Sequence, residues 1–221
     1  MNKNRLEHPV LIYMYGLPGS GKSFVSRQLA EMLGMAHVSS DRLRSELFEK
    51  PKHDKTEYQI ITHLMDFMTE QFLNAGVSAV YDISVSRLAD RRAIRDMARK
   101  LGVKEMMVWV QIDADTAWVR TQSRDHRKAD DKYSLPMSQE IFDRYMSLMQ
   151  NPQNENYLVL SGKHLFNNQK TSLVRRLREI GVISDNTLEQ KVPKPELINL
   201  VSRAQVQAGR VDYTRRNVII R

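Results

Sequence analysis

The sequence has no cysteine, which excludes disulfide bridges and thiolate metal sites. It also lacks any apolar run near the roughly 18 residues that a membrane-spanning helix needs, so we expect no membrane partner. The short apolar run after the first residues is predicted to be a strand rather than a signal peptide. Since nothing in the composition suggests export, we expect a cytoplasmic protein.

Acidic residues are too few to balance the basic ones, which leaves a net charge of +8. Residues 162–221 hold 12 Lys/Arg against 5 Asp/Glu, whereas residues 1–161 hold 22 against 21. We therefore predict a domain over 1–161 and a basic, mostly helical C-terminal extension over 162–221. Helices are expected near Gln169–Ile180 and Lys194–Ala208, with an edge strand near Asn217–Ile220. A basic segment attracts acidic partners, although a solvated surface explains it equally well.

Short apolar runs alternate with amphipathic segments along the chain, which predicts repeated strand–helix–strand units. Such units form a parallel sheet with helices on both faces, and 221 residues suffice for one such α/β domain. Ligands of these sheets bind beyond the carboxyl ends of the strands, so functional residues should directly follow each strand. The predicted strands are Val10–Tyr15, Ala36–Ser39, Val77–Ile83, Met106–Ile112 and Tyr157–Leu160.

The first strand is followed by Gly-Leu-Pro-Gly-Ser-Gly-Lys-Ser at 16–23, which satisfies the phosphate-binding pattern G-x-x-x-x-G-K-[ST]. Glycines let the backbone N–H groups approach phosphate oxygens, and the start of the next helix adds a favourable dipole. Lys22 would neutralise the β- and γ-phosphates, and Ser23 would supply an oxygen to Mg²⁺. We expect ATP and Mg²⁺ as cofactors, bound by Gly16, Pro18, Gly19, Ser20, Gly21, Lys22, Ser23 and Phe24.

Two carboxylates lie near the carboxyl ends of the second and third predicted strands. Asp41 could accept the proton of an attacking hydroxyl, but Ser40 and Asp41 are also good candidates for a helix N-cap. Asp82 could hold Mg²⁺ through water or hold the acceptor, and its alternative role is to close the strand and support the next helix.

Basic residues follow the fourth predicted strand. Asp113 is expected to cap a helix that contains Arg120 and Arg124, which lie four residues apart on one helix face. Arginines on a lid near residues 120–135 would suit the charge on a transferring phosphoryl group, although such a run usually forms a solvated face. Because switches and motors share the same loop, an ATP-dependent nucleic-acid-binding switch or adaptor stays open as a second function.

Together these residues resemble the small P-loop kinases related to the kinase domain of polynucleotide kinase, the zeta-type toxins and seryl-tRNA kinase. The resemblance covers about residues 10–161 and implies a P-loop NTPase fold with a five-stranded parallel sheet in the order 2-3-1-4-5. It implies that Asp41 activates the acceptor hydroxyl, that Arg44 contacts the acceptor, and that Arg120 and Arg124 embrace the phosphates or stack on adenine. The third-strand ending usual in the family is D-x-[ST]-N, and here the asparagine is replaced by Val85.

The acceptor is not specified by any motif. The basic extension favours a nucleic-acid 5′-hydroxyl over a small molecule, in which case binding should weaken steeply with salt. Against this, aromatic residues make up only 7% of the chain, and no strand is rich enough in them to stack single-stranded bases. A zeta-toxin-like nucleotide-sugar kinase is a further alternative, and the extension could instead be an oligomer contact.

Overall fold

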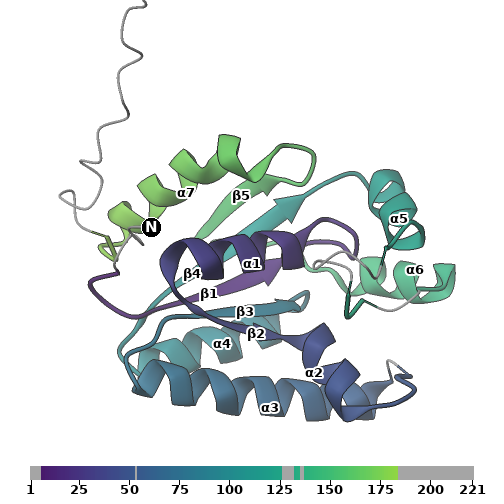
Figure 1. Ribbon diagram of the computed structural model, residues 1–221, viewed down its shortest axis with the longest axis horizontal. Coiled ribbons are helices and arrows are strands. Elements are labelled where there is room, and N and C mark those ends of the chain that lie inside the picture. The colour runs from purple at the N-terminus through teal and green to yellow at the C-terminus, as the bar shows by residue number, and fades with distance from the viewer. Residues whose placement is uncertain (1–5, 53, 126–131, 135–136, 184–221) are drawn as a thin grey trace, which may run out of the picture. The chain divides into compact units, whose positions relative to one another are not determined.

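The computed structural model describes residues 6–52, 54–125, 132–134 and 137–183 (Figure 1). The helix expected at Lys194–Ala208, the strand expected at Asn217–Ile220 and part of the predicted lid lie outside these residues. Within the described part, no helix combines the length and apolar character needed to span a membrane.

A single parallel sheet has its strands in the order β2-β3-β1-β4-β5, which confirms the predicted fold class and the order that the family resemblance implies. The buried run VLIYMY forms the central strand because it is covered on both faces. The strands are β1 (Val10–Tyr15), β2 (Ala36–Ser39), β3 (Ala79–Ser84), β4 (Lys104–Gln111) and β5 (Tyr157–Ser161).

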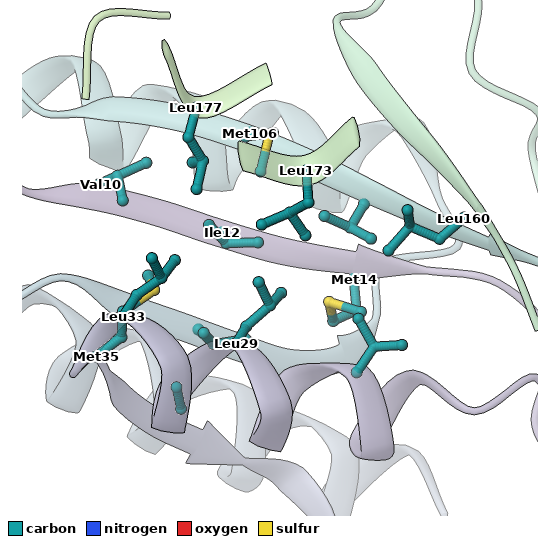
Figure 2. Close-up of a cluster of buried hydrophobic side chains, with 14 of the residues drawn as sticks. Val10, Ile12, Met14, Leu29, Leu33, Met35, Met106, Leu160, Leu173 and Leu177 are labelled. Atoms are coloured by element: carbon teal, nitrogen blue, oxygen red, sulfur yellow. The ribbon is translucent and has the colours of Figure 1, made fainter. Parts of the chain in front are cut away.

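Alternate residues of β1 enter two separate hydrophobic cores, because successive side chains of a strand point to opposite faces. One face packs against α1 (Lys22–Leu33) and α7 (Phe166–Glu179), as Figure 2 shows for Leu29 and Leu173 beside Ile12. The other face packs against α3 (Lys55–Asn74) and α4 (Leu88–Lys100). The sheet is therefore a rigid layer between two pairs of helices.

Helix α7 lies in the segment that the charge distribution set apart as an extension. Its Leu173 and Leu177 are nevertheless fully buried in the same core as Val10, and Val182 beyond the helix is buried too. Glu7 N–H donates to the carbonyl of Val182 at 3.0 Å, which ties this segment to the start of the chain. Up to residue 183, the packing is thus continuous with the sheet.

The remaining helices lie near the arrowhead ends of the strands (Figure 1). They are α2 (Ser40–Leu47), α5 (Ala114–Gln122) and α6 (Gln139–Leu148). Each of α2 and α5 directly follows a strand, whereas α6 comes from the chain between α5 and β5. The carboxyl edge of the sheet is therefore surrounded by short helices, as expected for the ligand-binding edge of an open α/β sheet.

Candidate functional site

The backbone of the loop at 16–23 packs directly against the backbone of neighbouring segments. Gly19 has a φ of +79°, and a Cβ atom there would lie only 2.2 Å from the carbonyl oxygen of Ala117 in α5. Gly162, directly after β5, approaches the loop from another side, because its Cβ would lie 2.5 Å from the carbonyl oxygen of Ser20. Only glycine fits such contacts without displacing the loop. The shape of the loop is thus fixed by distant parts of the chain.

Lys22 is folded against the loop from which it projects. Its Nζ donates to the carbonyl oxygens of Gly16 at 3.0 Å and Leu17 at 2.7 Å. Burial lowers the pKa of Lys22 to about 8, although the charges of Asp82 and Asp41 act in the opposite direction. A bound polyanion would favour the ammonium form, so phosphate binding should raise the pKa of Lys22 again.

Asp82 connects the loop with the second strand. The pairing of β1 with β3 shifts register between Tyr13 and Met14, and Asp82 falls within this irregular stretch. Its side chain is 2% exposed, with one oxygen 3.4 Å from Ser23 Oγ and the other 2.9 Å from His37 Nε2. Ser23 and Asp82 therefore present adjoining oxygens, which are the ligand type that Mg²⁺ prefers.

Asp41 lies in the first turn of α2, where a carboxylate is favoured by the helix dipole. The N-cap of this helix is Ser39, whose Oγ accepts from the N–H of Arg42, so the alternative in which Ser40 or Asp41 caps the helix is wrong. Arg44 is buried and donates to Asp41 at 3.2 Å, while its Nε lies 3.6 Å from Glu57. Arg44 is thus held between two carboxylates as well as facing the cavity.

The two arginines of the predicted lid differ in their placement. Asp113 caps α5 as expected, and Arg120 in that helix donates to the carbonyl oxygen of Gly162 at 2.8 Å. Arg124 lies beyond the end of α5 at Gln122, so the prediction of one helix face carrying both arginines is wrong. Both side chains still reach the same cavity, because the chain turns after the helix.

One cavity of about 310 Å³ brings most of the predicted site residues together. Gly16 and Ser20 belong to the loop but do not line the cavity. The carbonyl of Gly16 accepts from Ser84 Oγ, and Ser20 is fully buried. Phe24 lies at the rim, 37% exposed and edge-to-face with Phe166. The predicted residues that line the cavity are Pro18, Gly19, Gly21, Lys22, Ser23, Phe24, Asp41, Arg44, Asp82, Arg120 and Arg124.

Sequence patterns missed several residues that the structure brings to this site. Tyr145 of α6 lines the cavity, and burial raises its pKa despite the opposing charge of Arg44. His37 contacts Asp82. The available signal in the sequence was the position of His37 two residues before the end of a predicted strand. Gly162, the glycine beside the last predicted strand, was a signal as well. No pattern marked Tyr145, because α6 follows no strand.

Comparisons with known proteins agree with this architecture. A family described as an AAA domain matches residues 11–152. Among solved structures, Kti12 of Chaetomium thermophilum in complex with ADP-AlF3 is similar with a TM-score of 0.61 and 16% identity, covering 77% of this chain and 98% of that one. The Mycobacterium tuberculosis APS kinase CysC in complex with AMPPNP and APS gives a TM-score of 0.55 and 21% identity, covering 77% and 98%.

A gluconokinase from Sinorhizobium meliloti is similar at a TM-score of 0.56 and 16% identity, covering 78% of this chain and 94% of that one. No curated protein sequence matches the chain. At these identities, the likeness to the solved structures establishes the shared fold.

Proposed function

We propose that this chain, which belongs to the family of AAA domains, is an ATP-dependent kinase that transfers the γ-phosphate to a hydroxyl group. The observation that carries the proposal is the cavity in which the phosphate-binding loop meets Asp41, Asp82 and three arginines. Proteins of similar fold include a gluconokinase and an APS kinase, which makes phosphoryl transfer the natural chemistry to test.

The nucleotide would be held by the loop and the start of α1. Backbone N–H groups at the helix N-terminus and the Lys22 ammonium would contact the phosphates. Ser23 and Asp82 would hold Mg²⁺, which when bound neutralises phosphate charge. In the described residues no three His, Cys, Asp or Glu side chains are grouped as metal ligands, and Mg²⁺ at such sites is commonly held by one or two protein oxygens with phosphate and water.

Asp41 would act as the general base. It would accept the proton of the acceptor hydroxyl while that oxygen bonds to the γ-phosphorus, and the bond from the γ-phosphorus to its bridging oxygen breaks so that ADP leaves with the electron pair. Arg44 fixes the position of this carboxylate through its 3.2 Å contact. Arg120 and Arg124 would stabilise the charge of the transferring group from the opposite wall.

The competing interpretation is a nucleotide-dependent switch or adaptor in which Asp41 only supports a helix. The Ser39 cap favours the kinase, because it already satisfies the start of α2 and leaves Asp41 to face the cavity. The preference for a nucleic-acid acceptor depended on the basic end of the chain, most of which lies outside the described residues.

The deciding experiment is transfer of labelled γ-phosphate from ATP and Mg²⁺ to 5′-hydroxyl DNA and RNA, nucleosides, nucleotide sugars and sugar acids. We expect label on one acceptor class, lowered at least about 100-fold in Asp41→Asn with ATP affinity retained. Lys22→Ala, which removes the proposed phosphate contact of the loop, serves as the negative control. A protein that binds ATP but labels none of these acceptors, or an Asp41→Asn variant with full transfer, would refute the kinase and favour the adaptor.

A further inference from the structure

A second cavity, of about 480 Å³, adjoins the first between the starts of α3 and α4 and one face of α6. Ser84 and Tyr145 line both cavities, so the two are neighbours at the end of β3. Tyr145 also lies within electrostatic reach of Asp41 and Arg44. We call this second space the acceptor cavity, because a molecule with a hydroxyl beside Asp41 would extend into it.

The acceptor cavity carries an excess of positive charge. Four cationic side chains line it, Lys52, Lys55, Arg87 and Arg144, and among the described residues none of the four has a carboxylate partner.

The two acidic residues in the lining are already engaged. Asp54 caps α3 and accepts from the N–H of Glu57 at 2.9 Å, and Asp90 accepts from the hydroxyl of Tyr58 at 3.4 Å. Burial raises the pKa of Tyr58, so its hydroxyl stays protonated and can keep donating to Asp90. Four cations against two carboxylates leave the lining with an excess of two positive charges.

One part of the lining is mostly apolar and comes from a single helix face. Ile141, Tyr145 and Leu148 of α6 lie at spacings of four and three residues, which places them on the same side of the helix. Arg144 adjoins this stripe. The cavity thus combines an apolar helix face suited to a ring with cationic side chains suited to a charged substituent.

We propose that the acceptor is a phosphate monoester that also bears a free hydroxyl, with its phosphate held by Arg87, Arg144 and Lys55 and its hydroxyl beside Asp41. This inference rests on the proposed kinase function and names its substrate class. Guanidinium groups bind phosphate oxygens through paired, charge-assisted hydrogen bonds, which makes two arginines and a lysine a suitable receptor. A neutral polyol would leave these cations without partners and would bind weakly.

The test uses matched pairs of acceptors that differ only by a phosphate: ribose 5-phosphate against ribose, and adenosine 3′-monophosphate against adenosine. The two pairs distinguish a sugar phosphate from a nucleotide as the source of the phosphate. We expect kcat/KM to be at least about 30-fold higher for the phosphorylated member of one pair. In Arg87→Ala/Arg144→Ala, this preference should fall below about threefold through a higher KM. Arg92→Ala, on the exposed side of α4, is the control and should leave the preference unchanged.

Failure of the inference is distinguishable from failure of the kinase proposal. If the neutral acceptors are labelled as efficiently as the phosphorylated ones, the kinase stands and the phosphorylated acceptor is wrong. If none is labelled, a binding experiment decides whether the cavity is a phosphate receptor. Ribose 5-phosphate and adenosine 3′-monophosphate are titrated into protein saturated with a non-hydrolysable ATP analogue. Binding of either compound that is lost in the double arginine variant supports the cavity as a phosphate receptor, and absence of binding overturns it.

Discussion

The nucleotide side of the site, the loop at 16–23, differs in construction from the acceptor cavity beside it. The loop is one continuous stretch of chain, and close backbone contacts at Gly19 and Gly162 hold it in place. The acceptor cavity is assembled from residues far apart in the sequence, including Lys55, Arg87 and Arg144, whose side chains are exposed. Nucleotide phosphates require fixed backbone donors, whereas acceptor recognition depends on replaceable side chains.

This contrast indicates how the two sides should respond to mutation. Changes at the packed glycines of the nucleotide side displace backbone and should weaken the binding of any nucleotide strongly. Changes at the acceptor cavity remove single charges and should alter which acceptor is used, because the sheet that supports them is unaffected. The following predictions test this contrast, from the largest expected effect to the smallest.

Gly19→Ala should have the largest effect, a loss of ATP affinity of about 100-fold, because strain at positive φ and crowding against the Ala117 carbonyl together amount to roughly 3 kcal/mol. Gly76→Ala is the matched control, since Gly76 also has positive φ but has no atom within 4 Å of the added methyl. Titration calorimetry with ATP would measure both. Equal losses in the two variants would show that strain alone, and not the packed loop, governs binding.

Arg124→Ala should lower kcat by about 100-fold and change ATP affinity far less, because the guanidinium is proposed to stabilise charge that develops only during transfer. Single-turnover transfer, compared with ATP binding, separates the two effects. Arg92→Ala provides a control of equal charge change outside the cavity. An unchanged kcat would remove Arg124 from the chemistry.

The pH dependence of ATP binding should report Lys22. Its pKa is about 8 in the free protein, and bound phosphates favour the charged form, so the pKa rises on binding. Affinity should be fully present below pH 8 and fall by up to about tenfold per pH unit above it, with a proton taken up on binding. Calorimetry in buffers of different ionisation enthalpy measures that proton. Lys22→Arg should lose this dependence, and proton uptake that persists in this variant would assign it to another group.

His37→Ala should have the smallest effect, a several-fold higher Mg²⁺ concentration at half-saturation with nearly normal kcat at saturating metal, because Asp82 loses the contact that orients it. Mg²⁺ titrations of the transfer rate would measure this change. His63→Ala, on the exposed side of α3, is the control. If the Mg²⁺ concentration at half-saturation does not change, the contact between His37 and Asp82 has a structural role in joining β2 to β3.

The fold was predictable because most of its strands contain short apolar runs, and each predicted strand matches an observed one to within two residues. The boundary at 161 illustrates the opposite case. Charge counting separates Leu173 from the sheet, but its burial beside Val10 depends on where α7 packs. Net charge describes the exposed face of a helix and gives no information about the face that it buries.

By itself, the sequence determined the elements that depend on local chemistry: the phosphate-binding loop, the strands around it and the carboxylates Asp41 and Asp82 near the strand ends. Tertiary structure alone decided that His37 would meet Asp82, that Tyr145 would join the two cavities, and that Arg44 would be held between carboxylates. The physical reason is the distance along the chain over which each effect acts. Hydrophobic periodicity and glycine conformations act over a few residues, whereas these contacts bring together segments whose proximity is created only when the sheet and its helices pack.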